Sequence, residues 1–339
     1  MKQRGFRYCS TCSTKLQKRG LTAAGTQRWY CKVCSVSGIK PRGDLSRGFV
    51  LDRFVDYLLG KESQDELPAT LKLSSRAWRT DIAWCWDIVP TPTLSGEVYP
   101  VLLMDGTRVG EQSCLVVRSP KWVIHWRFVP WEASWSWDML LRTIAAPHVI
   151  VCDGQKGMLL SIARNWPHTR IQRCLFHLWQ NIRKKLSLNP QTAAGIDLLE
   201  HYKTIWHIDT AALGSEWENV FYEMYAYHKA FLDEKTYNSI TTPNKRRWWY
   251  THRNTRSAYR QIAKLLQAKQ LFTYLDPELL KLTEEPIPRT TNHVEGGTHS
   301  TLKGQLYLHR GMPAEHQRRL ADWYLYKKTE QQKPPRKFL

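Results

Sequence analysis

Three acidic residues that lie far apart in the sequence carry the chemistry expected of this chain. Asp105 follows the apolar run Val-Leu-Leu-Met, Asp153 follows Val-Ile-Val-Cys, and Glu295 stands much later in Asn-His-Val-Glu295-Gly-Gly. A carboxylate just past a buried strand lies at the strand's carboxyl end, where open α/β sheets bind their ligands. Two such carboxylates and a third from a helix could hold a pair of divalent cations for in-line phosphoryl displacement. Mg²⁺ or Mn²⁺ suits these hard oxygen ligands.

The expected order of elements brings the two aspartates together. We expect three strands, a helix and a fourth strand, over residues 98–104, 114–118, 122–129, 137–144 and 147–152. A right-handed crossover through the helix would place the fourth strand parallel to the first and beside it. Asp105 and Asp153 would then be neighbours at one edge of a mixed sheet, which is a ribonuclease-H-like α/β arrangement.

Each acidic residue also has a purely structural alternative. Asp-Gly is a turn dipeptide, so Asp105 and Asp153 could simply end their strands. Asn292-x-x-Glu295 resembles a capping box, and a Glu is favourable at a helix start. Against this, Gly296-Gly297 continues a helix poorly and suits the close approach of a backbone or a ligand.

Composition indicates a globular protein with a polyanionic partner. The 339 residues are 42% hydrophobic and carry a formal net charge of +20, which favours nucleic acid as that partner. The N-terminus has no apolar leader, and no run suits a membrane helix. We therefore expect a cytoplasmic protein that binds no membrane and whose 8 cysteines are metal ligands or core residues rather than disulfides.

Residues 1–45 predict a zinc ribbon. Cys9-x2-Cys12 and Cys31-x2-Cys34 have the spacing of two knuckles that present four thiolates to one structural Zn²⁺. The segment is strongly basic, and whether it contacts DNA or only stabilises structure is left open by charge alone.

Residues 46–95 predict a helix-turn-helix domain. Helices are expected over 47–59, 65–71 and from Ser74 or Ser75 to about Ile88. Arg76 and Arg79 would lie near the start of the last helix, where such motifs contact DNA. Many trihelical units bind no DNA, so this motif is less specific than the cysteine pattern.

The catalytic core is expected to be interrupted. Residues 96–188 form its first part, 189–286 an all-α insertion, 287–330 the C-terminal helices with Glu295, and 331–339 a basic tail. In the insertion, positive charge alternates with aromatic residues, so that DNA contacts are expected from Lys245, Arg246, Arg247 and Trp248. The alternative there is a helix with a tryptophan core face, and the tryptophans of 122–137 are likewise expected in the core. Lys303, His309 and Arg310 are further candidates for phosphate contacts.

Together these motifs resemble the DDE transposases of bacterial insertion sequences in the Mutator-like superfamily. The most specific part is Cys174-x2-His177 after the second Asp, combined with Thr291-Asn292-x-x-Glu295 and His309-Arg310-Gly311. Many relatives carry an Asn shortly after the Glu, where Thr298 and His299 stand here, which puts any supporting role of that position in doubt.

The resemblance implies a DNA transposase that binds terminal repeats, cuts with two Mg²⁺ ions held by Asp105, Asp153 and Glu295, and joins a 3′-hydroxyl to target DNA. Double-stranded DNA would be the partner, and a homodimer or higher assembly on DNA, associated with the bacterial nucleoid, is expected by analogy. Cys174 and His177 would support the active site. The alternatives are a transposase-derived DNA-binding protein without catalysis and a ribonuclease-H-like nuclease that cuts without joining.

Overall fold

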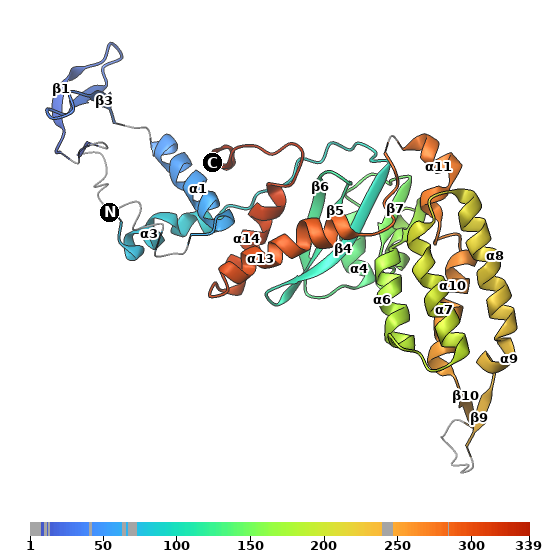
Figure 1. The fold of residues 1–339 in the computed structure, drawn as a ribbon. Coiled ribbons are helices and arrows are strands. Elements are labelled where there is room, and N and C mark those ends of the chain that lie inside the picture. The colour runs from blue at the N-terminus through green and yellow to red at the C-terminus, as the bar shows by residue number, and fades with distance from the viewer. Residues whose placement is uncertain are drawn as a thin grey trace. The chain divides into compact units, whose positions relative to one another are not determined.

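A computed structural model describes residues 8–9, 12, 14–40, 43–62, 66, 73–238, 247–283 and 285–339 of the chain. The chain divides into two compact units, one formed by residues 1–90 with 333–339 and the other by residues 91–332. The larger unit contains a five-stranded sheet and most of the helices (Figure 1). Each unit is described by itself.

The sheet of the larger unit is mixed, and its strand order is β6-β5-β4-β7-β8. Its strands are β4 Val101–Val109, β5 Gln112–Arg118, β6 Val123–Val129, β7 Val149–Cys152 and β8 Arg170–Arg173. β4, β7 and β8 run parallel, whereas β4, β5 and β6 form an antiparallel meander. The prediction that the strand before Asp153 lies parallel to the strand of Asp105 is therefore confirmed.

The two faces of the sheet are covered by different helices. Leu102 and Met104 point to the main core, together with α4 (Ser134–Leu141) and α5 (Lys156–Asn165). Successive strand residues point to opposite faces, so Asp105 faces the other side, where α14 (Ala314–Tyr326) packs on β4 and β6. There the indole of Trp126 donates a 2.8 Å hydrogen bond to the Asp322 carboxylate.

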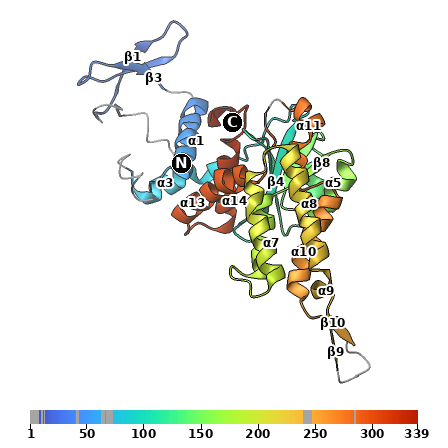
Figure 2. The same cartoon turned by 45° about the vertical axis from the view of Figure 1, so that its right-hand side comes forward.

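The predicted insertion is mostly but not wholly helical. Its helices and the helix that leads into it are α6 Leu175–Leu186, α7 Ala193–Lys203, η2 Thr204–His207, α8 Ala211–Tyr227, α9 Lys229–Leu232, α10 Arg253–Gln267, η3 Thr273–Leu275 and α11 Pro277–Leu282. Between α9 and α10, β9 (Lys235–Tyr237) pairs with β10 (Trp248–Tyr250) in an antiparallel ribbon at the end of the helices (Figures 1 and 2). The expectation of an all-α insertion was wrong here, because strands this short leave no periodic signal.

One long helical segment crosses back to the sheet after the insertion. It consists of α12 (Asn292–Val294), a π-helical turn η4 (Glu295–Ser300) and α13 (Thr301–Leu308), and α14 follows. π-helical turns inside helices are rare and often occur at functional sites.

The smaller unit contains a three-stranded sheet, one long helix and shorter ones in its described part. The strands are β1 Gln17–Leu21, β2 Gln27–Tyr30 and β3 Ser37–Ile39, in that order. The helices are α1 Gly43–Leu59, α3 Ser75–Ile82 and η1 Ala83–Asp87. The predicted helix over 65–71 lies outside the described residues, apart from Glu66.

The end of the predicted basic tail is packed within the smaller unit. Residues Pro335–Phe338 form the 3-10 helix η5, which contacts α1. The guanidinium of Arg336 lies 3.6 Å from the Asp52 carboxylate, and a Cβ at Gly48 would come within 3.1 Å of the Arg336 side chain. The sequence signal for a tail was its charge, which does not exclude packing.

The tryptophans between 122 and 137 are divided between core and surface. Trp126 and Trp137 are buried as expected. Trp131 and Trp135 are 62% and 43% exposed and meet edge to face, and Trp122 is also exposed. The prediction that the tryptophans of 122–137 lie in the core is thus wrong for Trp122, Trp131 and Trp135.

Candidate active site and candidate metal centre

Asp105 and Asp153 are neighbours at one edge of the sheet. The last parallel pair between β4 and β7 is Met104 with Cys152, and each aspartate is the residue that directly follows one member of this pair. Asp105 does not end its strand as expected, because β4 continues in antiparallel pairing with β5 as far as Val109. Its side chain is largely buried, at 12% exposure.

A tight turn shapes the backbone after Asp153. Gly154 adopts φ +81°, which favours glycine, and a Cβ there would overlap the guanidinium of Arg173. That guanidinium donates a 2.6 Å hydrogen bond to the Asp153 carbonyl. The Asp153 carboxylate accepts a 2.8 Å hydrogen bond from the backbone N–H of Gln155. Both the backbone and the side chain of Asp153 are therefore fixed.

Glu295 begins the π-helical turn and is oriented by Thr291. The Thr291 hydroxyl, which is fully buried, donates a 2.6 Å hydrogen bond to the Glu295 carboxylate. Thr291 rather than Asn292 holds the N-cap position of α12, and it makes no capping hydrogen bond with its side chain. The contact therefore orients Glu295 and does not form the capping box considered for the sequence.

Arg118 ties the segment around Glu295 to the sheet. It lies at the end of β5, is buried, and donates hydrogen bonds to the His293 carbonyl and, at 2.9 Å, to the Thr298 hydroxyl. The same guanidinium also donates to the carbonyls of Ser119 and Pro120. Because a buried guanidinium needs its donors satisfied, this network fixes the π-helical turn against β5.

His299, at the position that departs from many relatives, contacts a candidate metal ligand. His299 Nδ1 lies 3.2 Å from Asp105 Oδ2, and the imidazole is buried. Thr298, its neighbour, accepts the hydrogen bond from Arg118. Both residues thus make contacts at the candidate site, which their residue types alone did not indicate.

Cys174 and His177 lie beside Glu295. The Thr291 amide and hydroxyl lie 3.3 and 3.2 Å from Cys174 Sγ, and His177 Nδ1 lies 3.5 Å from Glu295 Oε1. A hydrogen bond with Cys174 raises the pKa of His177 to about 9 against the effect of burial, and the charges of Cys174, Glu295 and Asp105 act in the same direction. Burial raises the pKa of the Cys174 thiol, but hydrogen bonds with His177 and Thr291 outweigh it and lower that pKa.

Glu132 is a fourth carboxylate in this site that the sequence did not predict. It lies in the turn between β6 and α4, after Phe128-Val129-Pro130-Trp131, and was not considered as a candidate ligand. A Cβ at Gly106 would come within 2.3 Å of its carboxylate, so the absent side chain of Gly106 leaves room for it. Burial and the negative charges of Asp105 and Asp153 raise the pKa of Glu132.

All four carboxylates line one cavity of ≈ 630 Å³, together with His177, His299 and Lys303. Ligand atoms of Asp105, Asp153 and His177 lie within 4.8 Å of one another, as do those of Cys174, His177 and Glu295. The sequence thus predicted three of the four carboxylates that the structure brings together. Such a concentration of negative charge, with Asp105 buried and the other three residues half-buried, is unfavourable unless a cation offsets it.

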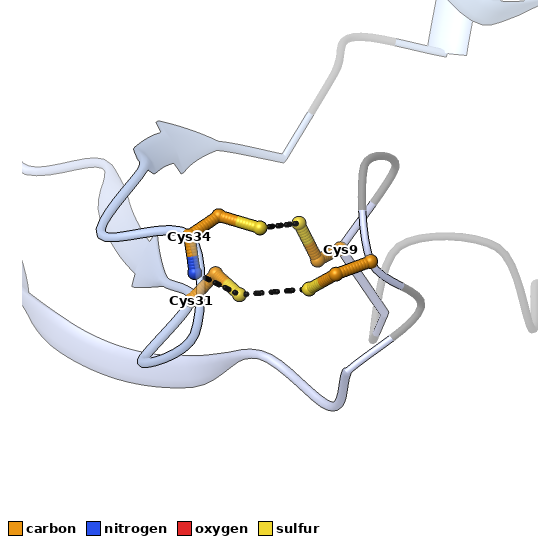
Figure 3. A group of neighbouring side chains, drawn as sticks. Cys9, Cys31 and Cys34 are labelled. Carbon is orange, nitrogen blue, oxygen red and sulfur yellow. Dashed lines mark hydrogen bonds between the residues drawn. The ribbon is translucent and has the colours of Figure 1, made fainter.

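The four N-terminal cysteines converge as the knuckle spacing predicts. Their sulfur atoms all lie within 4.8 Å of one another, with Cys9 to Cys34 at 4.0 Å and Cys12 to Cys31 at 3.4 Å (Figure 3). Four sulfurs about 2.3 Å from one tetrahedral ion would be about 3.8 Å apart. Hydrogen bonds with Thr14 lower the pKa of the Cys12 thiol to about 6, whereas the hydrogen bond with Cys12 and burial raise the pKa of the Cys34 thiol to about 12. This donor set fits a bound metal ion.

The predicted DNA-contacting residues are dispersed. Arg76 and Arg79 are exposed on α3, whose other face buries Trp78 and Ile82 and whose first turn is capped by Ser74. Arg247 and Trp248 are exposed at the β9–β10 ribbon, while Lys245 and Arg246 lie outside the described residues. Lys303 lines the acidic cavity and Arg310 is exposed, but His309 is buried, which does not suit a phosphate contact.

Part of the chain matches a known protein family. Residues 130–243 match the family described as transposase, Mutator family. The match contains Glu132, Asp153, Cys174 and His177 and lies between Asp105 and Glu295 in the sequence. No helix in the described part of the chain is long and apolar enough to cross a membrane.

Two curated relatives are transposases of insertion sequences. The transposase for insertion sequence element IS905 of Lactococcus lactis is 27% identical over 194 residues, which cover 51% of this chain and 47% of that protein. A probable transposase for an insertion sequence element of Corynebacterium diphtheriae is 24% identical over 124 residues, or 31% of this chain and 36% of that protein. The chain thus spans less than half the length of either relative in these matches. Together with the family match, they support a bacterial insertion-sequence transposase, as the motifs indicated.

Proposed function

We propose that this chain is a DNA transposase that cuts and joins DNA with two divalent cations held by Asp105, Asp153 and Glu295. The observation that carries the proposal is the convergence of these three carboxylates, distant in sequence, on one cavity. Mg²⁺ or Mn²⁺ ions, when bound, would activate the attacking oxygen and stabilise the leaving oxygen of an in-line displacement. The strand order around Asp105 and Asp153 supports a ribonuclease-H-like core.

The neighbouring side chains prepare the carboxylates for this task. The Thr291 hydroxyl orients the carboxylate of Glu295 through a hydrogen bond, and the His299 imidazole contacts the carboxylate of Asp105. His177 and Cys174 support the site from the side of Glu295. The exposed ammonium group of Lys303 lies at the cavity, where it can offset the charge of a phosphodiester.

The smaller unit would recognise DNA. We propose that Cys9, Cys12, Cys31 and Cys34 hold a structural Zn²⁺ and that α3, with Arg76 and Arg79, belongs to a helix-turn-helix that binds terminal repeats. The net charge of +20 favours a polyphosphate partner. Synapsis of two element ends would require a homodimer or a higher assembly.

A cutting assay with matched variants tests the proposal. Purified protein is incubated with a fluorescent duplex that carries the element's terminal repeat, with Mg²⁺ or with chelator. We expect Mg²⁺-dependent cutting and strand joining, a loss of at least about 10³-fold in Asp153→Asn, and parental cutting in Asp209→Asn, which changes an exposed carboxylate of the insertion. Cutting by Asp153→Asn at the parental rate would refute the assigned site, and cutting without joining would indicate a nuclease.

A further inference from the structure

One face of α10 carries a row of positive charges that the proposed catalysis does not use. Arg253, Arg256, Arg260 and Lys264 follow at intervals of three or four residues, which places them on one side of the helix. The opposite side buries Ala258, Tyr259, Ile262, Ala263, Leu265 and Leu266 in the insertion. The helix is therefore fixed by its apolar face and presents the charged face outward.

Two further cations face this row from other elements. Arg173 of β8 and Lys185 of α6 line the same cavity of ≈ 510 Å³ as the α10 residues, and α6 contacts α10 (Figure 1). Among the described residues that line this cavity there is no carboxylate. We call this cavity, with its six cationic side chains, the α6–α10 groove.

The charges of the groove are poorly neutralised within the described part of the chain. Arg256 lies 3.1 Å from the Asp233 carboxylate. Lys185 instead bonds the neutral side chain of Gln261 and the Ser257 carbonyl, and burial lowers its pKa. Like charges four residues apart on a helix are unfavourable to one another. An ordinary solvated face would mix both signs, so this row is better explained by an anionic ligand.

The groove adjoins the candidate active site through Arg173. Its guanidinium both lines the groove and donates the hydrogen bond to the carbonyl of Asp153. From Arg253 to Lys264 the helix rises about 16 Å, which equals the rise of about five phosphates along one strand of duplex DNA. A DNA strand that lies along α10 would therefore extend toward the turn that carries Asp153.

We propose that the α6–α10 groove binds the sugar–phosphate backbone of duplex DNA next to the phosphate that is cut. The cutting rests on the proposed function, but the binding does not. Contacts of this kind position DNA and carry no sequence information. Their signature is a steep dependence of affinity on salt, since each neutralised phosphate releases counterions.

The test compares two double variants of equal charge. Arg260→Gln with Lys264→Gln removes two exposed cations of the groove, and Arg142→Gln with Lys229→Gln removes two exposed cations elsewhere in the same unit. The affinity of each for a short fluorescent duplex of arbitrary sequence is measured by anisotropy over a range of salt concentrations. The slope of log K against log salt is negative. In the groove variant it should become less steep by about 1.8, because each lost phosphate contact contributes about 0.9.

The control variant should keep the parental slope. A groove variant with the parental slope, or with the same loss as the control, would overturn the proposal, since net charge alone would then account for binding. The cutting assay of Asp153→Asn is run separately, because it tests the proposed catalysis and not the groove. If Asp153→Asn still cuts while the groove variant loses slope, the proposed catalytic site fails and the groove stands.

Discussion

The two candidate metal centres of this chain differ in how far apart their ligands lie in the sequence. The four cysteines come from two short knuckles in a small sheet, and their ligand atoms are sulfur. The carboxylates of the larger unit come from β4, from the turns after β7 and β6, and from η4, and they lie on a large buried core. With the proposed ions, the first centre would need its metal in order to fold, whereas the second would fold without metal and need it in order to act.

The largest expected effect is the unfolding of the cysteine centre by a substitution that leaves the larger unit folded. Cys31→Ser removes a buried thiol and should abolish zinc binding and melt the ribbon, because apparent binding energies of structural zinc are about 10–16 kcal/mol. The larger unit should still unfold cooperatively in calorimetry. Val33→Ala, at an exposed position of the same knuckle, is the control. Retention of one zinc per chain by Cys31→Ser would contradict the four-thiolate site.

A middle-sized effect is expected on rate at the carboxylate centre. Thr291→Val should slow Mg²⁺-dependent cutting about 10- to 100-fold, because it removes the hydrogen bond that orients Glu295. The apparent affinity for Mg²⁺ should weaken while DNA affinity is unchanged. Thr291→Ser keeps the hydroxyl and should restore most of the rate. If Thr291→Val lost stability only, with an unchanged rate per folded molecule, Thr291 would have a structural role alone.

The smallest effect concerns the charge of Glu132. Its pKa is raised above the ordinary 4.5, so the folded protein holds this proton more tightly than the unfolded chain does. Stability is therefore lost as pH rises from 4.5 through the raised pKa. In chelator above that window, Glu132→Gln should be slightly more stable than the parent, because the amide carries no charge that Asp105 and Asp153 repel.

Urea unfolding at several pH values, with and without Mg²⁺, measures this difference. Added Mg²⁺ should stabilise the parent more than Glu132→Gln, because the ion offsets the same repulsion. Equal stability of the two proteins at every pH would show that the charges of Asp105 and Asp153 do not repel that of Glu132.

The contrast between the centres also explains what the sequence could predict. The cysteine cluster follows from local spacing, and the neighbourhood of Asp105 and Asp153 follows from the handedness of one crossover. Glu132 was missed because only the turn after β6 brings it over Gly106. His299 was left in doubt because its contact with Asp105 depends on the π-helical turn, which has no sequence signature comparable to a strand or a cap.

Calorimetric titration of the full chain with Mg²⁺ tests the central claim most directly, since thiolates bind this hard cation poorly. The parent should bind Mg²⁺, and Asp105→Asn with Asp153→Asn should abolish the heat of binding while Asp209→Asn retains it. Unchanged Mg²⁺ binding by the double variant would contradict a metal centre formed by these carboxylates.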